Sequence, residues 1–126
     1  MSRQVVSTEK APAAIGPYSQ AIKAGGFVFT SGQIPIVPAS GKIEATEIAG
    51  QTEQVMKNLE AVLAAAGTGF AKVVKTTIFL VDLAHFATVN EIYAKRFAKE
   101  PPARSCIQVS KLPKDSLVEI EMVAFS

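Results

Sequence analysis

A nine-residue run of mostly aliphatic and β-branched side chains, Val73–Val81, constrains the fold of this chain more than any other segment. Such a nearly continuous run predicts a strand in the middle of a sheet that is covered on both faces. Amphipathic segments flank it at residues 48–66 and 82–97, and each repeats apolar side chains at the three- and four-residue steps of a helix. A central strand between two helices requires a layered fold in which helices pack against a sheet.

The ends of both predicted helices carry recognisable signals. Thr46 or the residue before it is placed to cap the first helix, and Gly67 is placed to end it in a left-handed turn. Asp82 or a neighbour can cap the second helix, and Pro101 and Pro102 forbid its continuation. The buried side of this second helix is predicted to carry Phe86, Val89, Tyr93 and Phe97.

Shorter strands are predicted on either side of this unit, at residues 3–6, 19–24, 27–31, 104–109 and 117–124. Gly25-Gly26 lies between two of them and is a typical hairpin signal. Residues 37–42 are interpreted as a turn-rich loop. The expected element order is β-β-β-α-β-α-β-β, a single domain over residues 1–126. This order predicts an α/β (α+β) fold with two helices on one face of a mixed sheet.

Alternation along the last two strands predicts a shared polar face. Arg104 and Cys106 point to one face of their strand, and Glu119 and Glu121 point to one face of theirs. If the intervening apolar side chains line one core, an arginine, a thiol and two carboxylates meet on the other side.

The sheet face away from the helices is expected to leave apolar side chains uncovered, namely those of Leu117, Val123 and Phe125. Apolar area is unfavourable in water by about 25 cal/mol per Å². We therefore expect homo-oligomerisation through this face.

Charge and the rarer residue types limit the chemistry. The net charge is only +2, with no basic cluster longer than Lys95-Arg96, which argues against a nucleic-acid partner. The single histidine, His85, and the single cysteine make a zinc site and an internal disulfide implausible. Neither a dinucleotide-binding nor a phosphate-binding glycine loop is present. No apolar run reaches membrane-spanning length and no signal core follows the N-terminus, so we expect a soluble cytoplasmic protein.

Each candidate site residue also has a purely structural interpretation. Arg104 can grip a carboxylate through two parallel hydrogen bonds, or form a cross-strand ion pair with Glu119 or Glu121. Either glutamate can orient or deprotonate water, or belong to a solvated strand face. Cys106 can be a nucleophile activated by the nearby arginine, a buried small hydrophobe, or a position where only the backbone amide matters.

Four further candidate positions also have both a functional and a purely structural interpretation. Gly32, which follows Ser31 at a strand end, permits a close approach of the backbone to a ligand or forms a plain turn. Tyr18 can close over a pocket or lie in the core with a satisfied hydroxyl. Asn90 is one step off the apolar stripe of the second helix, where a capped or solvated amide is common.

Several stretches together resemble the RidA family of reactive-intermediate deaminases, also called the YjgF-like proteins. They are residues 11–21 (APAAIGPYSQA), 30–35 (TSGQIP), 89–90 (VN), 102–106 (PARSC), 112–114 (LPK) and 118–121 (VEIE). The resemblance runs from end to end of the chain. It implies a chorismate-mutase-like α/β fold assembled as a homotrimer with three sites between subunits, in agreement with the uncovered sheet face.

The resemblance also implies an activity, that of a 2-iminobutanoate/2-iminopropanoate deaminase. Such an enzyme hydrolyses enamines and imines, including 2-aminoacrylate/2-iminopropanoate and 2-iminobutanoate, to 2-oxo acids and ammonia, with no metal or cofactor. Arg104 would hold the substrate carboxylate, and Glu119 would position or activate the attacking water. The backbone at Cys106 and Gly32 would fix the substrate.

Ser31, Tyr18 and Asn90 would line the cleft by the same resemblance. Other functions attached to this family are an endoribonuclease, a translation inhibitor and a chaperone-like holdase. A non-catalytic binder of 2-oxo acids is a further alternative, since it could use the same arginine.

Overall fold

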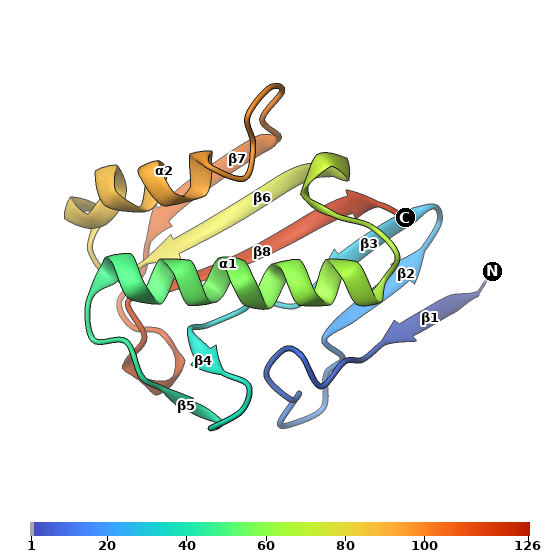
Figure 1. The fold of residues 1–126 in the computed structure, drawn as a ribbon, viewed down its shortest axis with the longest axis horizontal. Helices are drawn as coiled ribbons and strands as arrows, with labels where there is room; N and C mark the ends of the chain where they lie inside the picture. Colours follow the sequence, from blue (N-terminus) through green and yellow to red (C-terminus); the bar gives the residue numbers. More distant parts are fainter. Residues whose placement is uncertain (1) are drawn as a thin grey trace.

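The structure is a computed structural model that describes residues 2–126, and its centre is a six-stranded mixed sheet (Figure 1). The strand order is β1-β2-β3-β8-β6-β7, with β6 and β7 parallel and the other neighbours antiparallel. The strands are β1 (Arg3–Val6), β2 (Ala21–Ala24), β3 (Phe27–Thr30), β6 (Val73–Leu80), β7 (Ala103–Gln108) and β8 (Val118–Phe125). Helices α1 (Ile48–Ala65) and α2 (Phe86–Ala94) both cover one face of this sheet, so the predicted fold class is confirmed.

Strand β6 occupies the interior position that its composition predicts, between β8 and β7. Thr76, Ile78 and Leu80 are buried beneath the helices. Lys75 is exposed and Phe79 only half-buried on the opposite face, so within one chain the strand is covered on one face rather than two. The uncovered face of β6 is part of the sheet face that points away from the helices, which we call the open face.

Helix α1 follows its apolar pattern closely, since Val55, Leu59 and Val62 are fully buried in the core. Thr46 does not cap it: Glu47 is the N-cap residue, and its side chain makes no capping hydrogen bond. At the other end Gly67 adopts a φ of 81°, as predicted, and Thr68 N–H donates to the Leu63 carbonyl at 2.9 Å. This arrangement satisfies the last carbonyls of the helix.

Helix α2 is preceded by a 3₁₀ turn, Leu83–His85, which the sequence did not indicate. The Asp82 carboxylate accepts a hydrogen bond from Ala84 N–H at 2.9 Å, so its capping role is confirmed at the start of this turn. Val89 and Tyr93 are buried as expected. The expected burial of Phe86 is wrong, because 38% of this residue is exposed.

The loop expected at residues 37–42 is a turn between two very short strands, β4 (Ile36–Val37) and β5 (Lys42–Ile43). Two-residue strands are too short to show an alternating pattern, which explains why the sequence did not indicate them. Asn58 of α1 donates to the Ile34 and Ile36 carbonyls at 3.1 and 2.9 Å, and so ties this hairpin to the core.

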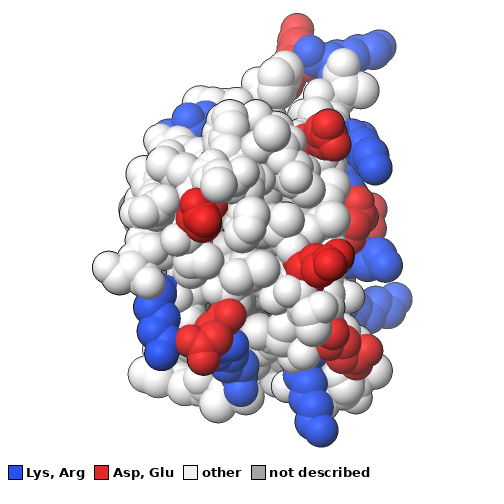
Figure 2. Space-filling model, turned by 90° about the vertical axis from the view of Figure 1, so that its left-hand side faces the viewer, with Lys and Arg blue, Asp and Glu red and all other residues white. Residues whose placement is uncertain are grey.

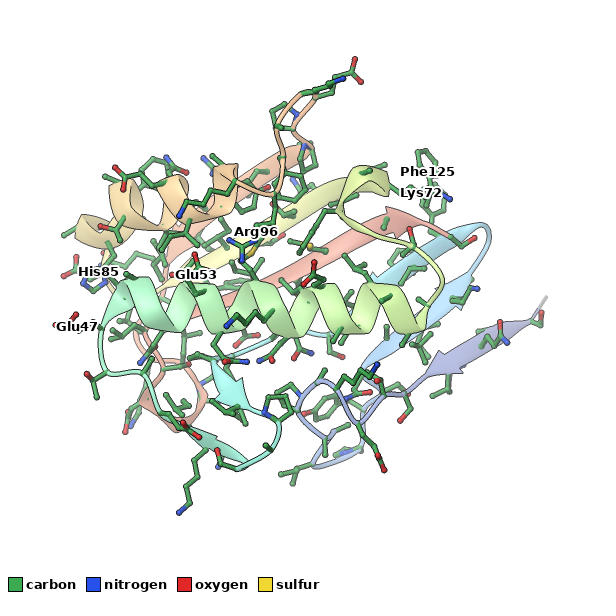
Figure 3. All side chains as sticks on the ribbon, in the orientation of Figure 1. Glu47, Glu53, Lys72, His85, Arg96 and Phe125 are labelled. Atoms are coloured by element: carbon green, nitrogen blue, oxygen red, sulfur yellow. The ribbon has the colours of Figure 1, made fainter. Side chains whose placement is uncertain are left out.

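An ion pair connects the two helices on their solvent side. Arg96, just after α2, and Glu53 of α1 point toward one another (Figure 3), with Nη2 and Oε2 3.0 Å apart. In the part of the chain that the structure describes, no helix is long and apolar enough to cross a membrane.

The open face carries the uncovered apolar side chains expected from the sequence. Phe125 is 51% exposed, Phe29 of β3 and Ile107 of β7 are also exposed, and Val123 and Leu117 are half-buried. Figure 2 views the molecule from one side, and the charged side chains gather along the margin formed by the helices rather than that of the open face. The homo-oligomer expected to cover this face stays a prediction.

Candidate active site

The sheet separates Arg104 from the two glutamates. Thr76 of β6 pairs with Arg104 on one side and with Met122 on the other, so all three side chains lie on the helix-covered face. Its neighbour Thr77 pairs with Glu121, which places Glu121, and Glu119 two residues earlier, on the open face. The prediction that these groups share one face is therefore wrong, and so is the cross-strand ion pair.

The error lies in the assignment of the apolar face of β7. A shared polar face would require the alternate side chains of β7, among them Ile107, to line the core. In the structure β7 is an edge strand whose Ile107 points to the open face and is exposed. Cys106 faces the helices instead and packs against the core. Burial raises the pKa of the Cys106 thiol, and the nearby Arg104 lowers it by less. A thiol in this setting resembles a small hydrophobe more than an activated nucleophile.

Arg104 is held by neutral partners from α2. Its Nη1 donates to Asn90 Oδ1 at 2.6 Å, and its guanidinium carbon lies 5.3 Å from the Phe86 ring centre and 5.2 Å from that of Tyr93. The Tyr93 hydroxyl is fixed in turn by Thr76 at 2.8 Å. The aromatic rings stabilise the cation through their faces and leave most of its N–H donors unused.

No carboxylate neutralises this arginine among residues 2–126, where the ion pairs are Arg96–Glu53 and Lys111–Asp115. A cavity of about 530 Å³, which we call the arginine pocket, opens beside the guanidinium. Asn90, Tyr93, Pro101 and Pro102 form part of its wall. Arg104 is thus a fixed cation beside an accessible space.

A second cavity of about 540 Å³ lies where β3 ends, and we call it the carboxylate pocket. Glu119, Gly32, Ser31 and Tyr18 line it together with apolar side chains that include Ile15 and Ile34. Tyr18 is 51% exposed, so the interpretation as a core tyrosine is wrong. Of the predicted site residues, four therefore meet in this pocket, Asn90 and Arg104 meet in the arginine pocket, and Cys106 lines neither.

Gly32 lies directly against the Glu119 side chain. A Cβ atom at this glycine would overlap Glu119 Oε2 and would lie 2.8 Å from its Cδ. The close approach that a glycine permits is thus an approach of the Gly32 backbone to the Glu119 carboxylate of the same chain. Burial is the main reason why the pKa of Glu119 is raised above its ordinary value of 4.5, and the negative charge of Glu121 adds to it. A carboxyl group with a raised pKa is better suited to exchange protons with a reacting water near neutral pH.

The segment that presents Tyr18 depends on a residue that the sequence reasoning missed. The buried Gln20 accepts from Thr8 N–H at 2.6 Å and donates to the Thr8 and Pro12 carbonyls at 3.0 and 2.7 Å. Ser31 Oγ donates to the Ser19 carbonyl at 2.5 Å. A glutamine beside a proline- and glycine-rich loop was the only available signal, because such a loop needs side-chain partners for its backbone groups.

No group of three or more histidine, cysteine, aspartate or glutamate side chains that could hold a metal occurs within residues 2–126. The polar side chains that line the two pockets are two cations (Arg104 and Lys114), one carboxylate (Glu119), two amides (Asn90 and Gln33) and three hydroxyls (Ser31, Tyr18 and Tyr93).

Comparison with known proteins places this geometry in a family. The family model described as Endoribonuclease L-PSP matches residues 8–126. A curated relative from Arabidopsis thaliana, "Reactive Intermediate Deaminase A, chloroplastic", is 55% identical over 98% of this chain. The chain belongs to the RidA (YjgF-like) family. It spans 66% of the length of the Arabidopsis relative.

Other members of the RidA family cover the chain equally well. The human protein named "2-iminobutanoate/2-iminopropanoate deaminase" is 49% identical over 97% of this chain and 89% of its own length. Among solved structures, the Rid-family protein YyfA from Yersinia pestis has a TM-score of 0.97 at 50% identity, covering 99% of this chain and 100% of its own. E. coli TdcF with bound serine has a TM-score of 0.93 at 42% identity and covers 98% of each chain.

The names within the RidA family are not uniform, since relatives are called deaminases while the family model carries an endoribonuclease label. They support the deaminase interpretation without fixing a substrate for this chain. The Arabidopsis relative is named as chloroplastic, and the cytoplasmic location expected here stays a prediction.

Proposed function

We propose that this protein hydrolyses small 2-imino acids, and the enamines that interconvert with them, to 2-oxo acids and ammonia. The observation that carries the proposal is the state of Arg104, a fixed cation with no carboxylate partner among residues 2–126 and a cavity beside it. Such a guanidinium binds a substrate carboxylate through two parallel hydrogen bonds. The names of the deaminase relatives support 2-iminopropanoate and 2-iminobutanoate as its substrates.

Glu119 supplies the second requirement of the reaction, a group that handles water. The water oxygen bonds to the imine carbon while a proton moves to the nitrogen. The carbon–nitrogen bond then breaks as the carbonyl forms, and ammonia leaves. A protonated imine carbon is already electrophilic, so orientation, a water and proton transfer are sufficient. We therefore assign Glu119 to the water, Arg104 to the carboxylate, and the backbone at Gly32 and Cys106 to the remaining substrate contacts.

A small substrate must reach both groups, yet they lie on opposite faces of one sheet and line two separate cavities. We propose that the protein is a homotrimer in which the arginine pocket of one subunit meets the carboxylate pocket of the next. The exposed apolar side chains of the open face supply area for such contacts. A ring of three subunits then contains three equivalent sites.

A coupled assay tests the activity: a dehydratase generates the imine, and ammonia and 2-oxo acid release are measured with and without this protein. Arg104→Lys keeps the charge but loses the two-point grip, so we expect a loss of about tenfold to a hundredfold. Glu119→Gln should abolish turnover and keep 2-oxo acid binding. No acceleration by the wild-type protein would refute the proposal. Turnover that survives Glu119→Gln would refute the assignment of the water to that residue.

Mixing two inactive variants tests the site between subunits. Arg104→Ala and Glu119→Gln, unfolded and refolded together at equal amounts, should recover about a quarter of the wild-type activity, because one interface in each mixed trimer has both groups intact. Each variant refolded alone is the control. A complete lack of recovery in mixtures shown to contain mixed trimers would mean that both groups act within one chain.

The endoribonuclease label of the family model suggests a second activity, for which the site offers little. The single histidine, His85, has a buried Nδ1 atom without a hydrogen-bond partner among the described residues, and it lines neither pocket. RNA cleavage that persists in Arg104→Ala would have to come from another surface or a contaminant.

A further inference from the structure

The hydrogen-bond ladder between β3 and β8 is interrupted beside the carboxylate pocket. Phe29 pairs with Val123 in regular register. The next backbone pair is Gln33 with Ile120, whose two N–H to carbonyl distances are 2.8 and 3.1 Å. The chain leaving β3 therefore uses one residue more than β8 over the same span. This extra residue is a β-bulge, a device that bends a strand and redirects side chains.

A side chain replaces the missing backbone acceptor at the bulge. Thr30 Oγ1 accepts the hydrogen bond from Met122 N–H at 3.0 Å. In a regular antiparallel ladder this amide would donate to a carbonyl of the neighbouring strand. Met122 is buried, so its amide has little access to water as an alternative partner. The Thr30 hydroxyl is thus the group that closes the interrupted ladder.

The bulge also determines where Gly32 lies. The chain turns out of β3 through Ser31, whose N–H donates to the Gln20 carbonyl at 2.9 Å, and then places Gly32 against Glu119. The glycine backbone therefore packs against one side of the half-buried Glu119 carboxylate. Loss of the Thr30 anchor would let this segment move away from β8 and expose the carboxylate.

We propose that Thr30 is a positioning residue of the site, because its hydroxyl fixes the bulge that holds Gly32 against the Glu119 side chain. The inference rests on the proposed role of Glu119 in handling water. Thr30 itself touches no reacting group, and it acts through the backbone that covers the carboxylate.

The charged and titratable groups around Glu119 allow a specific readout. Glu121 is its charged neighbour on β8, and Lys114 and Tyr18 line the same pocket. On β6 the open-face residues that pair with Glu119 and Glu121 are Phe79 and Thr77, which carry no charge. Burial is the larger cause of the raised pKa of Glu119. A change at Thr30 that uncovers the carboxylate must therefore lower this pKa.

The test compares Thr30→Val, which keeps the shape and removes the acceptor, with Thr30→Ser, which keeps the acceptor. Carboxyl ¹³C NMR follows the titration of Glu119, and the coupled assay gives the pH profile. Thr30→Val should lower the pKa of Glu119, move the pH profile of imine hydrolysis in the same direction and reduce turnover by about tenfold to a hundredfold. Thr30→Ser should retain the wild-type titration.

Thr68→Val is the matched control, because Thr68 Oγ1 also bonds the β8 backbone, at the Phe125 carbonyl and 2.7 Å, but at the far end of the strand. It should leave the titration of Glu119 unchanged. Thr30→Cys adds a graded variant, because a thiol is a weak acceptor. The pKa of Glu119 in this variant must fall between its values in the wild type and in Thr30→Val.

An unchanged titration in folded Thr30→Val or Thr30→Cys would overturn the proposal. An equal shift in Thr68→Val would also overturn it, because the effect would then follow from general weakening of β8. A wild-type protein that hydrolyses no imine would refute the proposed function instead, and the NMR comparison would still decide the role of Thr30.

Discussion

Replacing Gly32 with alanine is the most direct perturbation of the carboxylate pocket, because it adds a single methyl group at the point of closest approach. The new Cβ atom would overlap Glu119 Oε2, and it would lie 2.8 Å from Cδ and 3.0 Å from Cγ. Contact distances between carbon atoms are about 3.5–4.0 Å. The Glu119 carboxyl group must therefore move by about 1 Å or more, since both its oxygen and its carbon atoms are too close.

The magnitude follows from that displacement. A misplacement of about 1 Å can reduce turnover by about a hundredfold, and we expect at least this loss for Gly32→Ala. Stability should change much less. Gly32 does not have a positive φ, and a half-buried glutamate can change rotamer at a cost of about 0.5–1.5 kcal/mol. The variant should remain folded and bind 2-oxo acids through Arg104.

The assay measures kcat and KM for a freshly generated imine, together with unfolding by denaturant. Gly69→Ala is the control, because Gly69 has extended backbone with a φ of −167° and its added Cβ would meet nothing within 4 Å. If Gly32→Ala retained turnover within about twofold of the wild type, the reasoning that Glu119 must occupy this position would be refuted.

Three further predictions follow from the same structure. Cys106→Ala should keep most of the activity, because burial raises the thiol pKa and the proposed reaction needs no covalent intermediate; a folded but inactive variant would contradict this. Glu119→Gln should be more stable than the wild type above the raised pKa of Glu119. This gain should disappear below pH 4.5, where the carboxyl is protonated in both folded and unfolded states, and denaturation at several pH values would show the trend. Glu53→Gln should instead reduce the stability of the protein, because the Arg96 hydrogen bond lowers the pKa of Glu53. The free energy of unfolding should fall by up to about 1 kcal/mol at neutral pH, and it should not change once the pH is below that lowered pKa. Thermal unfolding that shows no such trend would count against the ion pair.

Much of the fold could be predicted from local signals that tertiary packing did not override. The apolar run of β6 placed it inside the sheet, and the two glycines at 25 and 26 adopt positive φ values of 58° and 84° in the expected hairpin. Gly67 ended α1 as expected. The β4–β5 hairpin was missed because each strand has only two residues.

The relation between the two pockets could not be predicted by alternation alone. Alternation gives the relative faces of residues within a strand, but it does not say which face of an edge strand meets the core. In β7 a cysteine faces the helices while Ile107 faces outward, the reverse of what hydrophobicity favours. The choice is made by the pairing of β7 with β6, since Arg104 opposite Thr76 must share its face. Phe86 was misplaced for a related reason, because its ring is used as a support for the arginine.

The division of the site by the sheet has a consequence for inheritance and dosage. In the proposed ring, a subunit that lacks only Arg104 or only Glu119 removes one site of the three, whereas a subunit that lacks both removes two. A point mutation in one gene copy would then be tolerated better than an allele with both defects. An assembling chain that lacks only one of the two groups would leave as many intact sites as a chain that fails to assemble. An assembling chain that lacks both would be more harmful, because each such subunit also inactivates a site that an intact neighbour would otherwise complete.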